Sequence, residues 1–244
     1  YIAIMDGITM GGGVGLSVHA STRIAADNTI FAMPETGIGL FPDVGGSWFL
    51  PRLPGELGMY MAMTGARLKS ADCVYAKICD AYMPSDRHDE FVAALRAGKG
   101  IENVLACFSV APGEAALAEI RDAIDLCFSG RSVEEIVMAL EADGSEWSTK
   151  QLGIMAGKSP TSQKVAYRQL RAGAALDFDG CMVMEYRMSQ AFMEGGDTFE
   201  GIRAVVVDKD MSPKWSPASL SDLSDADVAR YFISLGERDL TFPD

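Results

Sequence analysis

The sequence predicts an α/β fold at its beginning and a mainly helical structure in the remainder. Short apolar runs before Gly7 and around residues 22–33 have strand length and are rich in Ile, Ala and Phe. A helical segment near residues 12–22 lies between them, and a strand–turn–helix–strand order is typical of an α/β layer. We therefore expect residues 1–53 to form an α/β core with the loops of a site, and residues 54–244 to be mainly helical.

Seven segments of the second region have apolar residues at helical spacing. In chain order they are PGELGMYMAMTG, ADCVYAKI, DEFVAALRAG, GEAALAEIRDAIDLCF, VEEIVMALEA, TSQKVAYRQLRAGAAL and DGCMVMEYRMSQAFM. Ser132 and Glu135 form a capping-box pattern at the start of the fifth segment. EGIRAVVVDKD and DADVARYFISL close the chain, without a repeat or a long linker.

The composition limits the classes of partner. Of the 244 residues, 48% are hydrophobic and 23% are charged, which is typical of a folded globular protein rather than a disordered one. The formal net charge of −13 argues against binding to nucleic acid or to an anionic membrane. No run of 18 apolar residues is present, so the sequence predicts no membrane span. A small molecule is the expected partner.

The cysteines and histidines give little support for a metal site. The five cysteines form no CxxC pair, and only two histidines are present. We expect buried free thiols in a reducing compartment. Because the chain shows no basic signal region and is acidic, we expect a bacterial cytoplasmic protein, or a mitochondrial matrix protein if the source is eukaryotic.

The stretch MGGGVGL places Gly11, Gly12 and Gly13 between an apolar run and a helix. One interpretation is a tight turn with close packing of helix and strand. The other is a site made of backbone amides, because the first N–H groups of a helix are unpaired and carry partial positive charge. Such amides stabilise an oxyanion. The residues alone leave both interpretations open.

Three familiar motifs do not fit this stretch. Counting from Gly11, the third glycine of a dinucleotide-binding fingerprint would fall on Leu16, and no P-loop lysine follows. Ser17 and Ser47 lack the flanking glycines of a nucleophile elbow. The glycines therefore indicate neither nucleotide binding nor a serine hydrolase.

Two carboxylates lie in FAMPETGIGLFPDVGG, where Glu35 and Asp43 each follow a proline and precede glycines. Carboxyl groups in apolar, rigid loops tend to have shifted pKa values, and a pair of them can share the acid and base steps of a reaction. The alternative is that both side chains only cap or hydrogen-bond their own loops.

The block MDGITMGGGVGLSVHASTRIAADNTIFAMPETGIGLFPDVGGSWFLPRL resembles the crotonase (enoyl-CoA hydratase/isomerase) superfamily, and most closely its hydrolase branch. The resemblance continues through MTGARLKSAD, SPTSQKVAYRQL, EYRMSQAFM and EGIRAVVVDKDMSPKW, and is weakest in residues 87–150. It implies a crotonase-like (ClpP/crotonase) α/β spiral core followed by a mainly helical C-terminal region.

The resemblance also implies roles for individual residues. Gly12 would donate one oxyanion-hole N–H to a thioester carbonyl, with Gly11 beside it in the substrate-binding turn. Gly15 stands where hydratases carry a catalytic glutamate, whereas Glu35 matches the glutamate that both branches retain. Asp43 stands where the hydrolases carry an aspartate. This pattern favours hydrolysis of an acyl-CoA thioester over hydration.

Several alternatives stay open at this point. Glu35 would act either as a nucleophile, through a mixed anhydride, or as a general base on water. Asp43 would orient water or the substrate's hydroxyl group. The alternative functions are an enoyl-CoA hydratase or isomerase and a non-catalytic acyl-CoA-binding subunit. No cofactor is expected, since the CoA thioester is the substrate.

Further residues carry weaker expectations. Trp48 and Phe49 would line an acyl pocket or simply pack in the core. Lys209 and Lys214, with Arg203, would contact CoA phosphates or form surface ion pairs with neighbouring aspartates.

The resemblance also implies an N-terminal part of the fold that has no counterpart in this sequence. In the superfamily that part holds the second oxyanion-hole amide, in a loop of the GGD type, and much of the CoA-binding surface. We therefore expect this N-terminal remainder to be needed for activity, and we expect a homo-oligomer.

Overall fold

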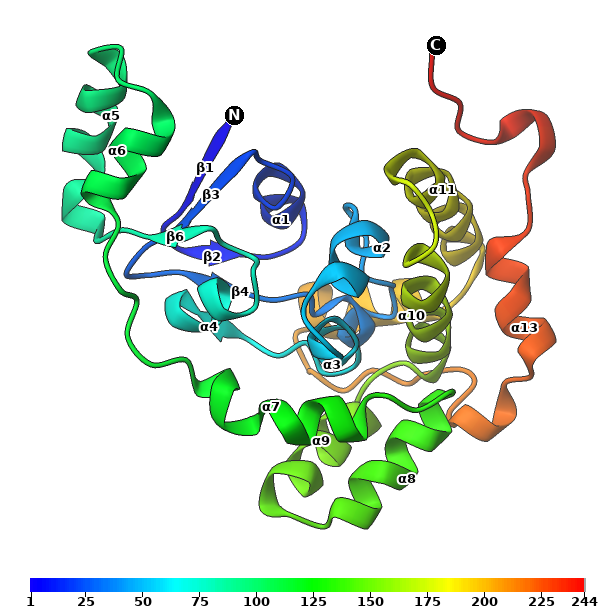
Figure 1. Cartoon of the computed structure of the whole chain (residues 1–244). Coiled ribbons are helices and arrows are strands. Elements are labelled where there is room, and N and C mark those ends of the chain that lie inside the picture. The colour runs from blue at the N-terminus through cyan, green and yellow to red at the C-terminus, as the bar shows by residue number, and fades with distance from the viewer. Residues whose placement is uncertain (244) are drawn as a thin grey trace. The chain divides into compact units, whose positions relative to one another are not determined.

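The computed structural model describes residues 1–243, which form two compact units (Figure 1). Unit 1 consists of residues 1–32 and 67–122, and unit 2 consists of residues 33–66 and the chain from Ala123 onward. Each unit is therefore assembled from two separate stretches of the chain. None of the three borders coincides with the division after residue 53 that the sequence suggested.

Unit 1 contains two small three-stranded sheets. In the first, β1 (Ile2–Met5), β3 (Thr22–Ala25) and β6 (Ala81–Tyr82) are parallel, with Ile2 opposite Thr22. In the second, β2 (Ile8–Thr9) is parallel to β4 (Ile30–Phe31), which is antiparallel to β5 (Leu68–Lys69). Its helices are α1 (Gly12–Ser17), α4 (Ser70–Tyr75), the 3₁₀ turn η3 (Ser85–Arg87), α5 (His88–Arg96), α6 (Ile101–Phe108) and most of α7 (Ala116–Cys127).

The strand prediction for residues 22–33 was only partly right. The segment contains two strands, because a turn at Ala26–Thr29 interrupts it. The Thr29 N–H donates to the Ala26 carbonyl oxygen at 3.2 Å, and the Ala26 N–H donates to Thr29 Oγ1 at 2.8 Å. The helix expected over residues 12–22 ends earlier, at Ser17, since β3 already begins at Thr22.

Two strands of unit 1, β5 and β6, lie in the segment that the sequence suggested was helical. Each has only two residues, so neither shows the alternation of apolar and polar residues that marks a strand. Ile24 on β3 and Met83 after β6 are buried together with Phe91 of α5 and Val104 of α6. This cluster is the core that holds α5 and α6 to the first sheet.

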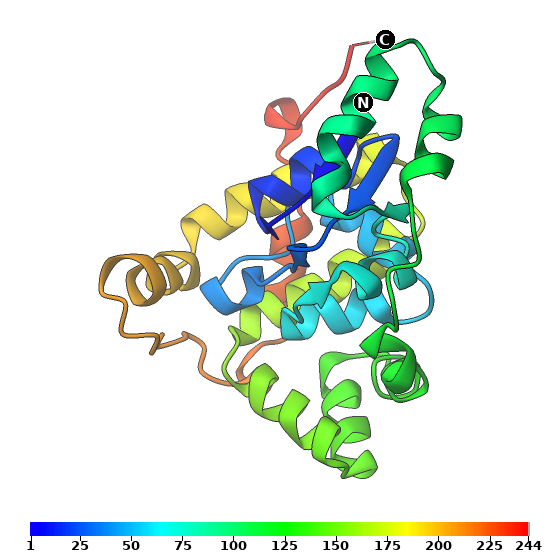
Figure 2. The same ribbon diagram turned by 90° about the vertical axis from the view of Figure 1, so that its left-hand side faces the viewer.

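Unit 2 is helical. Its elements are η1 (Glu35–Ile38), α2 (Gly46–Phe49), η2 (Leu50–Arg52), α3 (Leu57–Thr64), α8 (Val133–Asp143), α9 (Glu146–Ala156), α10 (Pro160–Gly173), α11 (Phe178–Glu194), α12 (Asp197–Ile202), the π-helical turn η4 (Arg203–Val207), η5 (Leu220–Asp222), α13 (Asp225–Ala229), η6 (Arg230–Phe232) and η7 (Gly236–Arg238). The helix α10 is central, since it contacts η1, α2, α3, α8 and α13 (Figure 2).

The seven helices predicted from periodicity are confirmed as α3, α4, α5, α7, α8, α10 and α11. The capping box is confirmed in part. Ser132 Oγ accepts the Glu135 N–H at 3.1 Å, but the Glu135 carboxylate accepts the N–H of Arg131 rather than that of Ser132. All five cysteines are free thiols, and four are buried as expected, whereas Cys107 is exposed. Within residues 1–243, no helix is both long and apolar enough to cross a membrane.

Candidate active site

Glu35 begins the short 3₁₀ turn η1, which follows Pro34 and ends at Gly39. The Gly37 N–H donates to the Pro34 carbonyl oxygen at 2.8 Å, and the Leu40 N–H donates to the Glu35 carbonyl oxygen at 3.0 Å. Gly39 has a φ of +70°, a conformation that residues with a side chain seldom adopt. The turn therefore fixes the backbone of Glu35 at both ends.

Three helices of unit 2 enclose η1. Thr36 donates its hydroxyl to the Ala62 carbonyl oxygen of α3 at 3.2 Å, and the Ser159 N–H at the start of α10 donates to the Thr36 carbonyl oxygen at 3.1 Å. Against α12 the backbones are in direct contact: a Cβ on Gly39 would lie 2.3 Å from the Asp197 carbonyl oxygen. Since such a distance excludes any side chain, the glycine is what allows α12 to pack here.

The Glu35 side chain is 4% exposed, and no group within residues 1–243 hydrogen-bonds its Oε2 atom. The pKa of Glu35 is raised to about 8, mainly by burial and also by the negative charge of nearby Asp43. A hydrogen bond from its own backbone and the positive charge of Lys158 act in the opposite direction. A buried carboxyl group with an unpartnered oxygen and a pKa near 8 is typical of a catalytic acid or base.

Sequence reasoning missed Lys158, whose side chain lies beside the Glu35 turn. A Cβ on Gly37 would be 3.0 Å from Lys158 Nζ, and a Cβ on Gly65 would be 3.4 Å from the same atom. The two glycines thus leave space for the ammonium group near Glu35. The one sequence signal was its position just before the helix start SPTSQK.

Asp43 lies in a tight turn that leads into α2. The Gly46 N–H donates to the Asp43 carbonyl oxygen at 2.8 Å, and Gly45 has a φ of +89°. Val44 has a φ of +50°, which is a strained conformation for a β-branched residue. Burial raises the pKa of Asp43, and no group within residues 1–243 hydrogen-bonds its Oδ1 atom.

Sequence reasoning also missed two side chains that hold this turn from distant helices. Glu185 on α11 is 7% exposed, and its carboxylate accepts the N–H groups of Gly45 and Ser47. Gln169 on α10 donates to the Pro42 carbonyl oxygen and to Ser47 Oγ. No local pattern marks either residue, because their partners are more than 100 positions away in the sequence.

Trp48 and Phe49 follow the Asp43 turn on α2. The guanidinium of Arg52 lies 3.4 Å from the centroid of the Trp48 ring, which also contacts Phe178 edge-on at 6.0 Å between centroids. Phe49 is buried. The contribution of either ring to an acyl pocket stays a prediction.

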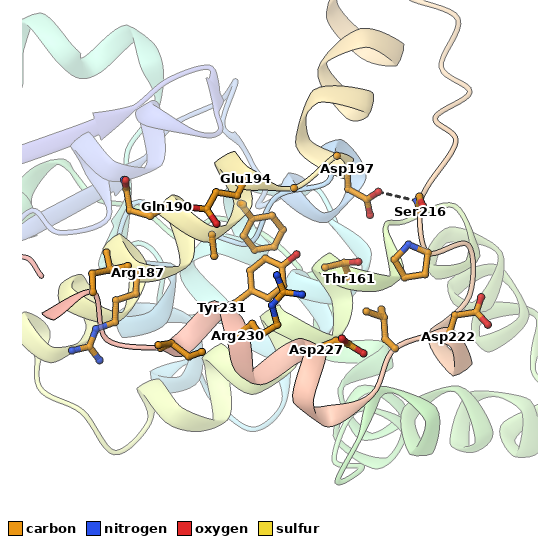
Figure 3. A pocket seen from close by; sticks show the side chains of 18 of the residues that line it. Thr161, Arg187, Gln190, Glu194, Asp197, Ser216, Asp222, Asp227, Arg230 and Tyr231 are labelled. Carbon is orange, nitrogen blue, oxygen red and sulfur yellow. Dashed lines mark hydrogen bonds between the residues drawn. The ribbon is translucent and has the colours of Figure 1, made fainter. Parts of the chain in front are cut away.

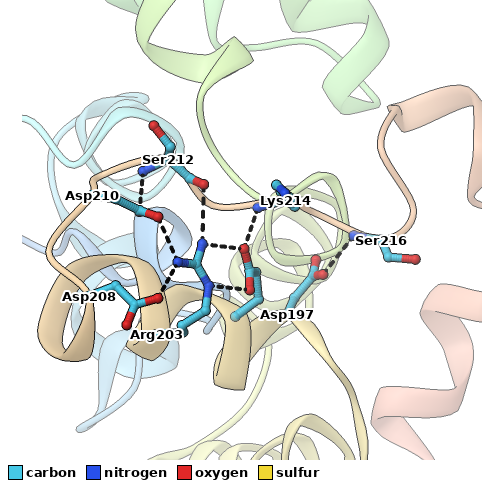
Figure 4. A network of polar contacts seen from close by, with 8 residues as sticks. Asp197, Arg203, Asp208, Asp210, Ser212, Lys214 and Ser216 are labelled. Carbon is cyan, nitrogen blue, oxygen red and sulfur yellow. Dashed lines mark hydrogen bonds and ion pairs between the residues drawn. The ribbon is translucent and has the colours of Figure 1, made fainter.

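The basic segment after α12 is organised around Arg203 (Figure 4). The guanidinium forms ion pairs of 2.7–2.8 Å with three carboxylates, those of Glu200, Asp208 and Asp210. The hydrogen bonds from the Arg203 guanidinium and from the Lys214 N–H lower the pKa of Glu200 to about 2. The expected surface ion pairs are therefore present at Arg203. Lys209 and Lys214 are exposed, and their contact with CoA phosphates stays a prediction.

Gly11 and Gly12 belong to unit 1, at the start of α1. Gly11 has a φ of +51°, and a Cβ at either position would meet no atom within 4 Å. The Gly13 N–H donates to the Met10 carbonyl oxygen at 3.0 Å, whereas the Gly12 N–H has no acceptor within residues 1–243. The amide is thus available to a ligand, as the oxyanion-hole prediction requires, although nothing in the structure tests that role.

A cavity of about 710 Å³ lies elsewhere in unit 2, between α11 and the segment that contains α13 and η6 (Figure 3). It is lined by polar groups of both signs, including Arg187, Glu194, Asp227 and Arg230. Neither Glu35 nor Asp43 is among its lining residues. In residues 1–243 no group of three or more His, Cys, Asp or Glu side chains is arranged to hold a metal ion.

Comparison with known proteins now identifies the class. The family model described as enoyl-CoA hydratase/isomerase matches residues 1–232. The chain belongs to this family, and the predicted crotonase-like α/β fold is confirmed.

Two curated relatives are named "3-hydroxyisobutyryl-CoA hydrolase, mitochondrial". The chain is 47% identical to the one from Xenopus laevis and 46% identical to the one from Homo sapiens. The alignments cover 98% and 99% of this chain, but 65% of each relative. The chain thus spans just under two thirds of the length of these relatives.

Solved structures give the same fold. A carnitinyl-CoA dehydratase from Mycobacterium thermoresistibile superposes with a TM-score of 0.93 at 41% identity. An enoyl-CoA hydratase from Rhodobacter sphaeroides superposes with a TM-score of 0.91 at 35% identity. Each match covers 99% of this chain and 70% of the solved one.

Proposed function

We propose that the protein hydrolyses an acyl-CoA thioester, 3-hydroxyisobutyryl-CoA, and releases CoA and 3-hydroxyisobutyrate. The observation that carries this proposal is the pair of carboxyl groups of buried Glu35 and half-buried Asp43, each with a buried oxygen that no described residue binds. The curated relatives that match nearly the whole chain carry the name of this hydrolase, which supports the choice of substrate.

Glu35 is the group that acts on the thioester in this proposal. As a nucleophile, its carboxylate would attack the carbonyl carbon and expel CoA as the thiolate, and water would then hydrolyse the mixed anhydride. As a general base, it would take a proton from water while the oxygen of that water attacks the carbonyl and the thiolate leaves. A pKa of about 8 suits both routes, because about a tenth of Glu35 is already ionised at pH 7 and most of it is ionised above pH 8.

Asp43 and Gly12 complete the proposed mechanism. Asp43 would orient the attacking water or the substrate hydroxyl. In its protonated form it would also donate a proton to the departing thiolate and regain one from solvent. The unpaired Gly12 N–H would stabilise the negative charge that develops on the thioester oxygen, a contribution of about 2.7–4 kcal/mol for one such donor.

Hydration or isomerisation of an enoyl-CoA is the second candidate, because the matching solved structures are named as a dehydratase and a hydratase. It is the weaker one for this chain. Gly15 lies on α1 where the family resemblance implies one of the two catalytic glutamates of a hydratase, so Glu35 or Asp43 alone would have to add and remove protons. A non-catalytic acyl-CoA-binding subunit is a third candidate, and two carboxyl groups with unpartnered buried oxygens near a thioester argue against it.

The proposal places the protein in the breakdown of valine, with the CoA ester as substrate and no further cofactor. It includes assembly into a homo-oligomer. The proposed compartment is the mitochondrial matrix for a eukaryotic source and the cytoplasm for a bacterial one. The word mitochondrial in the names of the curated relatives supports the first.

The test is release of thiol from 3-hydroxyisobutyryl-CoA by the full-length protein, followed with a thiol-reactive dye. The Glu35→Gln and Asp43→Asn variants are measured beside it. Rapid turnover that both variants lose, with a slow but measurable residual rate in Asp43→Asn, supports the hydrolase and the two carboxylate roles. Absence of thiol release, with hydration of crotonyl-CoA in its place, would refute the proposal in favour of the second candidate.

A single turnover in ¹⁸O-labelled water separates the two routes for Glu35. The nucleophilic route places label in the Glu35 carboxylate when water opens the anhydride at the protein's carbonyl carbon. A labelled Glu35, recovered in a peptide after digestion, establishes the nucleophilic route; an unlabelled Glu35 excludes attack of water at the protein's carbonyl carbon.

A further inference from the structure

Glu185 lies in the interior of α11, far in sequence from the Asp43 turn that its carboxylate contacts. Its Oε2 accepts the Gly45 N–H at 2.9 Å, and its Oε1 accepts the Ser47 N–H at 2.8 Å. Both oxygens are thus used, each on a separate peptide group at the start of α2. This bidentate contact fixes the orientation of the turn as well as its position.

Among the groups of residues 1–243 that act on the Glu185 carboxylate there is no cation. Its partners are the two peptide N–H groups and the side chain of Ser47, and burial raises its pKa, with the negative charge of Asp43 as a further cause. A buried carboxylate without a cation is an expensive way to hold a turn, because a neutral side chain would avoid the cost of desolvation. A carboxylate at this position indicates that two hydrogen bonds of fixed direction to the turn are required.

The turn that Glu185 holds would not keep its shape by itself. Val44 has a φ of +50°, which a β-branched residue adopts only when its surroundings impose it. The first N–H group that Glu185 accepts is that of Gly45, the residue directly after Val44. These hydrogen bonds therefore hold the backbone next to the strained residue. Without them Val44 would relax, and Asp43 would move.

Gln169 of α10 holds the same turn through other atoms. Its Nε2 donates to the Pro42 carbonyl oxygen at 2.6 Å and to Ser47 Oγ at 2.8 Å. Asp43 thus lies between two anchored residues, Pro42 and Ser47. Its own carboxyl Oδ1 remains without a hydrogen-bond partner in residues 1–243 and is free to serve a ligand.

We propose that Glu185 is a positioning residue for the reaction: its contacts with Gly45 and Ser47 hold the Asp43 carboxyl group in its working position beside Glu35. The inference rests on the proposed function, in which Asp43 contacts the substrate or water. Glu185 acts only through Asp43 and touches neither.

A double-mutant cycle with Asp43 tests this role. In Glu185→Gln the new amide offers one oxygen and turns an NH₂ group toward a backbone N–H, so one of the two bonds is lost. We expect kcat for 3-hydroxyisobutyryl-CoA to fall by about 30-fold or more, with KM changed by less than about threefold. In the Asp43→Asn background the same change should lower kcat by less than about threefold, because its target is already absent.

The proposal would be overturned if Glu185→Gln lowered kcat by the same factor in the wild type and in Asp43→Asn. So would an unchanged kcat in Glu185→Gln alone. Glu194→Gln is the matched control, since it makes the same change at an exposed position of the same helix. If Glu185→Gln does not fold, Gln169→Met, which removes the opposite anchor, enters the same cycle and is subject to the same criteria.

A measurement without substrate separates this inference from the proposed function. Amide hydrogen exchange in the full-length protein should show Gly45 and Ser47 protected in the wild type and in Glu194→Gln. In Glu185→Gln both amides should exchange at least about tenfold faster. Unchanged protection refutes the positioning role even if the protein is a hydrolase. A hydrolase assay that fails while exchange accelerates refutes the proposed function, and the contact with the turn stands.

Discussion

In unit 1 the turn at Gly11 and Gly12 leaves backbone amides in open space, whereas in unit 2 the carboxyl groups of Glu35 and Asp43 are enclosed by crowded backbone. Both regions are rich in glycine, but for different reasons. A Cβ added at Gly12 would touch nothing, while one added at Gly39 would collide with α12. The first region uses glycine to expose an N–H, and the second uses it to bring helices close enough to bury a carboxyl group.

The largest expected effect concerns the enclosed region. Glu35→Gln removes the only group that the proposal allows to attack the thioester or to activate water. We expect kcat for thiol release to fall by about 10³-fold, within the range typical of such groups. Loss of less than tenfold, in a variant with wild-type unfolding temperature, would mean that the enclosed carboxyl group is not catalytic.

The pH dependence follows from the burial of Glu35. Its pKa is raised to about 8, so the ionised form that the mechanism requires is the minor one at pH 6 and the major one above pH 8. We expect kcat/KM to rise about tenfold per pH unit up to about pH 8 and then to level off, a gain of about 10² from pH 6. A profile that is flat from pH 5 to 9 would contradict the raised pKa.

Substitution of glycine by alanine should change stability in opposite directions in the two regions. A Cβ on Gly201 of α12 would lie 2.2 Å from the Ile38 carbonyl oxygen, so Gly201→Ala should lower the free energy of unfolding by about 2 kcal/mol. Gly13 in α1 has no atom within 4 Å of its Cβ position, so Gly13→Ala should raise it by about 0.5–1 kcal/mol.

Urea unfolding of the two variants beside the wild type measures both changes. Equal signs for the two substitutions would show that the glycines of the two regions serve the same purpose. That result would contradict the difference drawn above between the turn at Gly11 and Gly12 and the region around Glu35 and Asp43.

The smallest expected effect concerns Lys158, whose positive charge lowers the pKa of Glu35 and is the smallest of the four causes that set it. Lys158→Met should shift the rise of kcat/KM to higher pH. Asp43→Asn should shift it to lower pH, since the charge of Asp43 raises the same pKa. The pH profiles of kcat/KM for the two variants, measured with limiting substrate, should therefore shift in opposite directions from the wild-type profile. Shifts in one common direction would contradict the proposed surroundings of Glu35.

The sequence was sufficient to find Glu35 and Asp43, because each lies in a local pattern of proline, carboxylate and glycine and within a stretch that resembles a known family. It was sufficient also for the long helices, whose apolar faces recur over several turns. The sequence did not predict that Lys158, Gln169 and Glu185 lie at the site. Their relation to the site arises when α10 and α11 pack against η1 and α2, and no spacing in the sequence records that contact.

The strands show the same limit at a smaller scale. β1 and β3 have four residues each and were expected as part of longer apolar runs. β5 and β6 have two residues each, and only pairing with β4 and β3 makes them strands. Short strands of this kind are determined by their partners and carry no periodicity of their own.

The interleaving of the two units has a consequence for how the chain folds during synthesis. The first 32 residues cannot complete unit 1 until residues 67–122 have emerged from the ribosome, and residues 33–66 must wait still longer for α10 and α11. Until then the apolar surface of η1, α2 and α3 has no partner. The protein is therefore expected to depend on the order of folding more than a chain of two consecutive domains would, and to need protection from aggregation while it is incomplete.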